Sequence, residues 1–188
     1  MSTATDNFAA ASAALAQAVA ASANDPADAI RLLIPLASWV PPPIAGTSEV
    51  AAIANAAQDV VADNLRCAAC AALATATQSY QPASYQDAQA LRSTVCGVLD
   101  AEATLAADAG RDATYAALRT LRTMVSYDLA IRGANLAYLV EVSTLVSMPS
   151  LAEAWTLYQD TPREPAIVAS SGVAHPLFMP LDFPALSR

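Results

Sequence analysis

Apolar residues recur every three or four positions through most of the chain, and this spacing is typical of amphipathic helices. Polar or proline-containing stretches divide the pattern into five predicted helices, at about 6–23, 27–40, 48–80, 85–108 and 112–137. Pro26 suits a first helical turn, and Thr47 or Ser48 can accept a hydrogen bond from a free backbone N–H. Ser84, with Asp87 three residues later, has the spacing of a capping box.

The three longest predicted helices follow one another through short turns, which favours an antiparallel helical bundle over residues 44–138. Alanine is abundant in these helices, so their axes can approach to the lower end of the usual range of about 8–10 Å. Residues 1–43 are predicted to form two N-terminal helices, which pack on the bundle or project to a partner, and the consecutive prolines 41–43 make a stiff, extended connection. Trp39, beside these prolines, is difficult to bury and is a candidate contact residue.

A second pattern begins after residue 138. β-branched residues alternate with others at Val140, Val142, Thr144 and Val146. This period of two predicts a strand. A helix over 150–160, a short helix over 163–170 and a closing strand within 181–186 are expected to follow. The apolar stripe of the first of these helices should be Leu151, Ala154, Trp155 and Tyr158. The predicted fold class is mainly α, ending in a small βααβ unit over residues 139–188.

All nine basic residues of this 188-residue chain are arginine, and seventeen carboxylates give a formal net charge of −8. Nucleic acids and anionic lipids attract cations, so this balance argues against nonspecific binding to either. Four arginines lie close together, at positions 111, 119, 122 and 132. We expect them to pair with carboxylates of neighbouring helices or of a partner protein. Neither a secretion signal nor a membrane span is predicted.

The sequence predicts no metal site and no cofactor. Cys67 and Cys70 have CxxC spacing, but they lie inside a helical pattern without a flanking turn, and Cys96 lies within another predicted helix. The sole histidine is far away in the sequence. We interpret the three cysteines as small apolar residues of the helices.

No enzymatic activity is expected either. His175 is the only candidate for a general base at neutral pH, and its apolar neighbours favour a role in holding a loop. The Ser-Ser-Gly run at 170–172 lacks the frame of a nucleophile elbow. The carboxylate pairs considered for glycoside cleavage are Glu141 with Glu153 and Asp160 with Glu164. Because acidic residues near helix starts usually interact with the helix dipole, Glu153 is predicted to do so.

An ordered motif runs through the last forty residues: a strand, a proline, a helix with an aliphatic, alanine and Leu-Tyr core, an acidic turn, a short helix and a His-Pro-x-Phe segment. Its positions are Pro149, Leu151, Ala154, Leu157, Tyr158, Asp160, His175, Pro176, Phe178 and Pro180. This set resembles the C-terminal part of the DNA circularisation protein family of Mu-like contractile-tailed phages. Two features depart from that family, since Ser170 and Ser171 replace an arginine-asparagine pair and Leu177 replaces a glycine.

The resemblance implies that residues 139–188 form a LysM-like module. It also implies a structural protein of the phage tail baseplate or hub, located in the virion and binding other tail proteins (hub, wedge and tape-measure) in a multi-copy ring. A peptidoglycan-binding LysM module and a DNA-end-binding circularisation protein are the alternatives. The missing arginine-asparagine pair argues against the first, and the acidic, lysine-free composition argues against the second.

The candidate residues for a protein interface are Trp39, Trp155, Tyr158, His175 and Phe178. Trp155 and Tyr158 are three positions apart on one predicted helix, so their rings should lie on the same face. We expect Trp155 to lie in the small core, with a contact to a partner protein as the alternative.

Overall fold

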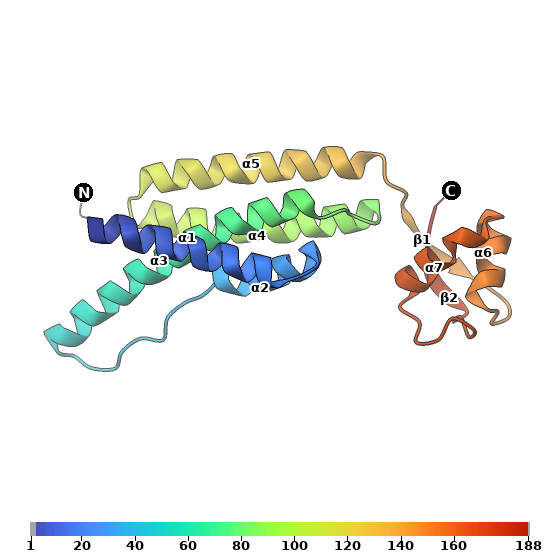
Figure 1. Cartoon of the computed structure of the whole chain (residues 1–188), viewed down its shortest axis with the longest axis horizontal. Helices are drawn as coiled ribbons and strands as arrows, with labels where there is room; N and C mark the ends of the chain where they lie inside the picture. Colours follow the sequence, from blue (N-terminus) through green and yellow to red (C-terminus); the bar gives the residue numbers. More distant parts are fainter. Residues whose placement is uncertain (1–2, 188) are drawn as a thin grey trace. The chain divides into compact units, whose positions relative to one another are not determined.

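Helices make up most of the structure, a computed structural model that describes residues 3–187. The elements are α1 (Thr3–Ser22), α2 (Pro26–Ala37), α3 (Glu49–Ser79), α4 (Tyr85–Asp108), α5 (Asp112–Ala134), β1 (Leu139–Ser143), α6 (Ser150–Tyr158), the 3₁₀ turn η1 (Thr161–Arg163), α7 (Glu164–Ser171) and β2 (Asp182–Leu186) (Figure 1). They divide between two compact units. The helical unit contains the chain up to residue 81 and residues 91–130, and the C-terminal unit contains residues 82–90 and the chain from residue 131. The predicted mainly α fold with a small sheet is confirmed.

Three helices begin at capping residues, and two of these, Ser48 and Ser84, were predicted. The side chain of Asp25 accepts a hydrogen bond from the Ala27 N–H (3.0 Å) before α2, and Ser48 accepts one from the Ala51 N–H (3.2 Å) before α3. At the start of α4, the Ser84 hydroxyl accepts a hydrogen bond from the Asp87 N–H (3.1 Å). The Asp87 carboxylate in turn accepts one from the Ala83 N–H (2.9 Å), one residue earlier than a capping box requires.

The core of the helical unit combines a few large aliphatic side chains with many alanines. α1, α2 and α3 pack against one another (Figure 1). The large aliphatic side chains of this core that are fully buried are Leu33, Leu73, Val95, Leu99 and Leu129. The remaining positions are mostly alanine, which keeps the gaps between helices narrow.

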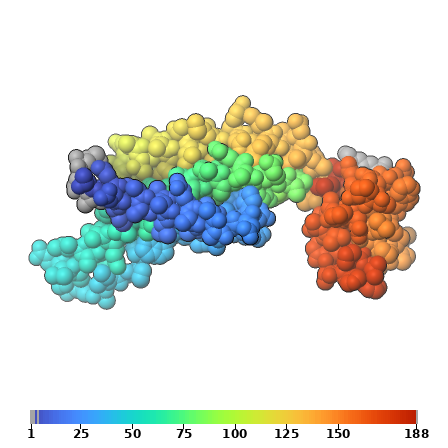
Figure 2. Space-filling model, in the orientation of Figure 1, coloured from blue at the N-terminus to red at the C-terminus, as the bar shows by residue number. Residues whose placement is uncertain are grey.

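The first half of α3 protrudes from the rest of the helical unit (Figures 1 and 2). Its apolar residues Val50, Ile53 and Val60 are exposed, although they recur at helical spacing. Segment 38–48 runs beside this part of the helix, and the Asn55 side chain holds it. The Asn55 amide accepts a hydrogen bond from the Ile44 N–H (2.8 Å) and donates one to the Ile44 carbonyl (3.2 Å).

The C-terminal unit has a small core of its own beneath a two-stranded antiparallel sheet. β1 pairs with β2 from Leu139↔Leu186 to Ser143↔Asp182. α7 packs on β2, and the buried apolar residues are Ala154, Ile167, Met179, Phe183 and Ala185. β1 ends at Ser143, so the predicted strand extended too far at its C-terminal end. Leu145 and Val146, which follow the end of β1, are exposed.

Candidate functional site

α6 buries a different face from the one predicted. Ser150, Glu153 and Ala154 are buried, whereas Leu151 is exposed and Trp155 is 59% exposed. The prediction that Trp155 lies in the core is therefore wrong. Ala154 belongs both to the predicted apolar face and to the face that is buried. Because the buried face also contains Ser150 and Glu153, which are polar, the sequence pattern favoured the other face.

Tyr158 joins the end of α6 to β2. Its hydroxyl donates a hydrogen bond to the Leu186 carbonyl (2.6 Å), and the Arg163 guanidinium lies 4.9 Å from the centre of its ring. Burial raises the pKa of the Tyr158 phenol, which the guanidinium and the hydrogen bond partly oppose. Because its ring is half-buried and its hydroxyl is bonded within the unit, Tyr158 mainly stabilises the unit.

His175 organises the turn that presents Phe178. Its Nδ1 accepts a hydrogen bond from the Leu177 N–H (3.2 Å), and its carbonyl accepts one from the Phe178 N–H (3.1 Å). The Pro176 carbonyl accepts a hydrogen bond from the Ser150 N–H (2.7 Å), which ties the turn to the first residue of α6. Phe178 itself is 72% exposed. The geometry matches the predicted loop-holding role of this histidine.

Four large apolar side chains are thus exposed on α6 and on the turn attached to it. We call this set the apolar surface: Leu151, Trp155, Leu177 and Phe178. It includes two of the predicted interface residues. Of the other three, Tyr158 and His175 hold the surrounding backbone in place, and Trp39 lies in the helical unit.

Glu153 lies on the buried face of α6 and is fully buried. Neither of its carboxylate oxygens has a hydrogen-bond partner among the described residues. Burial raises the pKa of this carboxyl above its ordinary value. The residue lies in the first turn of its helix, where its interaction with the helix dipole was predicted, but its burial was not predicted. Glu141, its suggested catalytic companion, is exposed on β1.

The other sequence candidates for catalysis make structural contacts. The Ser170 hydroxyl donates to the carbonyls of Ile167 and Pro184, at 3.1 and 2.8 Å. Glu164 accepts a hydrogen bond from the Ser150 hydroxyl (2.6 Å), which connects the starts of α7 and α6. These contacts connect α6, α7 and β2.

Trp39 lies at the edge of a buried ionic cluster in the helical unit. Arg66 in α3 pairs with Asp63 on the same helix and with Glu102 in α4, its Nε lying 2.6 Å from Glu102 Oε2. Arg111 pairs with Asp63 (3.0 Å). Arg66 Nη1 also donates a hydrogen bond to the Trp39 carbonyl (3.2 Å), so the cluster holds the start of segment 38–48 while the indole stays partly exposed.

Two cysteines lie close to this cluster. Burial raises the pKa of the Cys67 thiol to about 11 and that of Cys70 to about 12, and the Glu102 carboxylate adds to both shifts. Cys67 Sγ lies 3.6 Å from Glu102 Oε1. Within the described residues, no three or more side chains of His, Cys, Asp or Glu are arranged to hold a metal ion.

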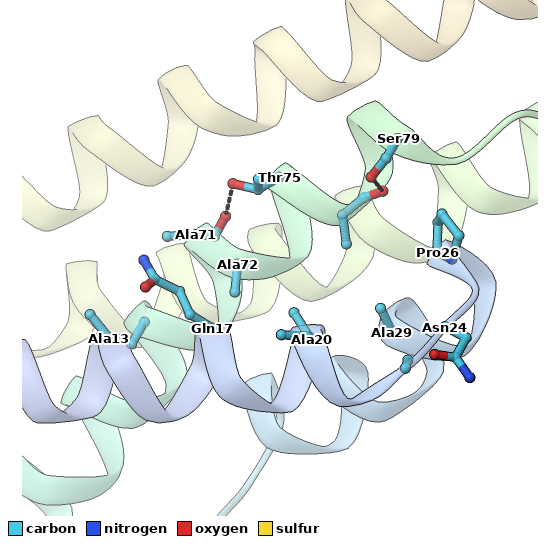
Figure 3. A pocket seen from close by; sticks show the side chains of 14 residues that line it. Ala13, Gln17, Ala20, Asn24, Pro26, Ala29, Ala71, Ala72, Thr75 and Ser79 are labelled. Atoms are coloured by element: carbon cyan, nitrogen blue, oxygen red, sulfur yellow. Dashed lines mark hydrogen bonds between the residues drawn. The ribbon is translucent and has the colours of Figure 1, made fainter.

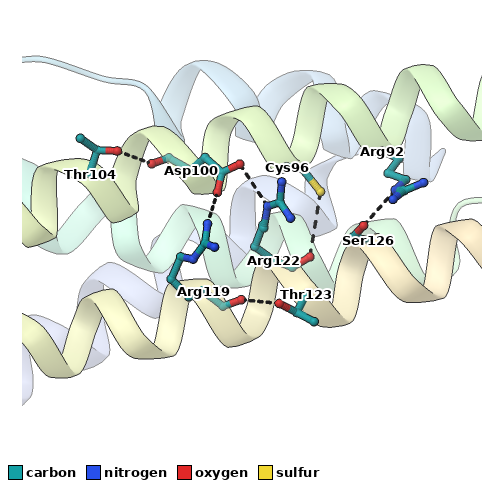
Figure 4. Close-up of polar contacts among 8 residues, drawn as sticks. All are labelled: Arg92, Cys96, Asp100, Thr104, Arg119, Arg122, Thr123 and Ser126. Atoms are coloured by element: carbon teal, nitrogen blue, oxygen red, sulfur yellow. Dashed lines mark hydrogen bonds and ion pairs between the residues drawn. The ribbon is translucent and has the colours of Figure 1, made fainter.

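Polar contacts join α4 to α5 along the helical unit (Figure 4). Asp100 in α4 pairs through its two oxygens with Arg119 and Arg122 in α5, each at 3.0 Å. Arg92 donates a hydrogen bond to the Ser126 hydroxyl (2.9 Å). The prediction that the clustered arginines pair with carboxylates of neighbouring helices is confirmed for these two and for Arg111.

An alanine-lined groove of about 570 Å³ lies between α1, the start of α2 and α3 (Figure 3). Its lining residues carry no charge, and they include Ala13, Gln17, Ala20, Ala29 and Ala72. The hydroxyls of Thr75 and Ser79, at its rim, bond to carbonyls of their own helix at 3.1 Å. The groove exists because the side chains that line it are small. The polar residues among them are exposed, so none is a buried group that would orient a ligand.

Comparison with known proteins gives no assignment. No model of a known protein family matches the chain, and a search of curated proteins finds no match. Among the helices of the described residues, none combines the length and the apolar character that crossing a membrane requires.

Proposed function

We propose that this protein is a structural adaptor of a contractile phage tail, in the baseplate or hub, and that its C-terminal unit is a LysM-like module. The order strand, helix, helix, strand over residues 139–186 supports the second part, together with the motif resemblance of the same segment. The observation that carries the adaptor role is the apolar surface, which stays exposed on a unit that already has a core of its own.

Leu151 and Trp155 are four residues apart on α6 and so share a face, and the turn with Phe178 is bonded to the first residue of that helix. Exposed apolar side chains on neighbouring segments mark contacts with other proteins, and tryptophan is enriched among the residues that dominate such contacts. Trp155 and Phe178 are the two largest members of the apolar surface. The hydrogen bonds of His175 and Pro176 hold the turn that carries Phe178, so this part of the surface is ordered before a partner binds. The net charge of −8 favours a partner with a basic rim.

The test is co-purification with tail proteins from assembled particles, and then affinity measurements with the isolated partner. We expect the double variant Trp155→Ala with Phe178→Ala to weaken binding by about thirtyfold or more, because loss of one dominant interface side chain costs about 2 kcal/mol. The control is Tyr127→Ala, which removes an exposed ring from α5 of the helical unit. Unchanged affinity of the double variant would contradict the assigned surface.

Two further measurements distinguish the alternatives. A tail adaptor should stay in the supernatant when the protein is mixed with purified cell wall, whereas a glycan-binding module sediments with it. A DNA-end-binding protein should be retained on linear duplex DNA at low salt and released as salt rises. Retention in either experiment, without binding to tail proteins, would replace the adaptor proposal.

A further inference from the structure

β1 has one edge that is paired and one that is open. In an antiparallel ladder, residues alternate between those whose backbone groups face the neighbouring strand and those whose groups face away. The hydrogen bond from the Thr144 N–H to the Leu181 carbonyl (2.7 Å) identifies the even-numbered residues as those that face β2. The backbone groups of Leu139, Glu141 and Ser143 therefore face away from β2.

A side chain already occupies the first of these outward positions. Gln86 Oε1 accepts a hydrogen bond from the Leu139 N–H (2.8 Å), and Gln86 Nε2 donates one to the Leu139 carbonyl (3.0 Å). The amide thus imitates a neighbouring strand for one residue. The outward N–H and C=O groups of Glu141 and Ser143 have no hydrogen-bond partner in the described part of the chain, so two successive outward positions are open.

The outer edge of β2 is blocked at Pro184 and at the Leu186 carbonyl. Pro184, opposite Glu141, has no N–H to donate. Its carbonyl accepts a hydrogen bond from the Ser170 hydroxyl (2.8 Å), and the Leu186 carbonyl accepts one from Tyr158. A proline and side-chain partners are ordinary means of blocking a sheet edge. β1 lacks both at Glu141 and Ser143.

The two faces of the sheet beside the open edge differ in chemistry. Glu141 and Asp182 lie on one face, and neither strand contains an arginine to balance them. Val140 and Val142 lie on the other face, where they help to line a cleft of about 230 Å³ with Thr156 and Leu157 of α6. An added strand would fit best if basic and apolar side chains alternated along it.

We propose that the open edge of β1 binds an extended, basic segment of a partner protein by strand addition. Main-chain hydrogen bonds to Glu141 and Ser143 supply the attachment, and charge complementarity with Glu141 and Asp182 selects the partner. A second copy of this chain fits less well, because it would place an acidic strand beside an acidic strand. The inference rests on the proposed adaptor function only in identifying the partner as a tail protein.

The test uses the full chain and a short synthetic peptide of alternating valine and lysine residues. Titration followed by amide NMR should give saturable shifts centred on Glu141 and Ser143, and the affinity should fall as salt is added. A peptide with glutamate in place of each lysine is the matched control, and it should not bind. Equal binding of both peptides would overturn the charge argument.

Glu141→Pro tests the backbone contact directly. It removes an outward N–H and leaves the bonds to β2, and the residue opposite is itself a proline. We expect a loss of affinity of about tenfold or more, which corresponds to roughly 1.4 kcal/mol. Glu141→Thr keeps the N–H and removes the charge, so it should weaken binding less. The amide signal of Val142 checks that β1 remains paired in both variants.

Three results would overturn the inference: full affinity in the Glu141→Pro variant, amide shifts confined to other elements, or sedimentation of the chain as a dimer that Glu141→Pro dissociates. The proposed function fails separately. A chain that binds the lysine peptide but no tail protein retains the open edge as a binding site and loses the adaptor role. A chain that binds a tail protein through Trp155 and Phe178 but does not bind the peptide retains the adaptor role and loses the open edge as a binding site.

Discussion

Glu153 is an ionisable residue in an apolar place. Its folded-state pKa is raised, so the charged form opposes folding, and the stability of the C-terminal unit should fall as pH rises through that pKa. Below the ordinary carboxyl pKa the penalty is absent, because the group is protonated in both states. Glu153→Met should therefore stabilise the unit at pH 7 by about 1–3 kcal/mol, and the gain should shrink in acid.

Denaturant unfolding at several pH values measures this effect. Glu141→Gln is the control, because that carboxylate is exposed and its removal should change stability by less than about 0.5 kcal/mol. A destabilised Glu153→Met protein at pH 7 would mean that the carboxylate has a stabilising partner in solution.

The thiols of Cys67 and Cys70 should react slowly. The thiolate is the nucleophile, and pKa values of about 11 and about 12 leave very little of it at pH 8. In a Cys96→Ser variant, we expect iodoacetamide to modify neither cysteine in the native protein and both in urea, as mass spectrometry would detect. Rapid native labelling would show that this part of α3 opens in solution.

In the C-terminal unit, α4 and α5 approach each other closely at Gly133, where there is no room for a side chain. A Cβ there would lie 2.8 Å from the Cβ of Ala88, so α5 and α4 would have to separate. Overpacking costs about 1–3 kcal/mol, against a gain of about 1 kcal/mol from the better helix propensity of alanine. Gly133→Ala should therefore lower the melting temperature, and adding Ala88→Gly should restore much of it. A more stable single variant would show that propensity outweighs the contact.

The helices themselves could be predicted because their signals are local. Capping residues such as Ser48 and Ser84 stand beside the turns they create, and alanine-rich repeats fill the segments between them. The buried face of a helix is not a local property. Val50 and Ile53 have the spacing of core residues, yet both are exposed.

The candidate site was partly predictable for the same reason. His175 and Phe178 lie in a short turn, whose geometry depends on neighbours in sequence. The open edge of β1 begins only after Leu139, because Gln86 bonds to the Leu139 backbone across 53 positions of the chain. Nothing near either residue indicates that contact, and an exposed glutamine in a first helical turn is unremarkable in sequence.

At the scale of the whole molecule, the described residues contain two separate apolar cores and one tryptophan in each unit. Phe183→Ala should destabilise the C-terminal core by about 3–5 kcal/mol, and Leu99→Ala should destabilise the helical core by about 2–5 kcal/mol. We expect the fluorescence of Trp155, in a Trp39→Phe background, to report the first change. Trp39, in a Trp155→Phe background, should report the second. Equal shifts of both probes in each variant would mean that the cores unfold as one.

Segment 38–48 has neither helix nor strand, and such a segment would ordinarily be the first place for a protease to cut. Arg66 holds it at Trp39 and Asn55 holds it at Ile44, with three rigid proline rings between these anchors. A protease must draw several extended residues into its own cleft, and no free span of that length remains between the two attachments. The stretch between Trp39 and Ile44 should therefore resist digestion although it has no regular secondary structure.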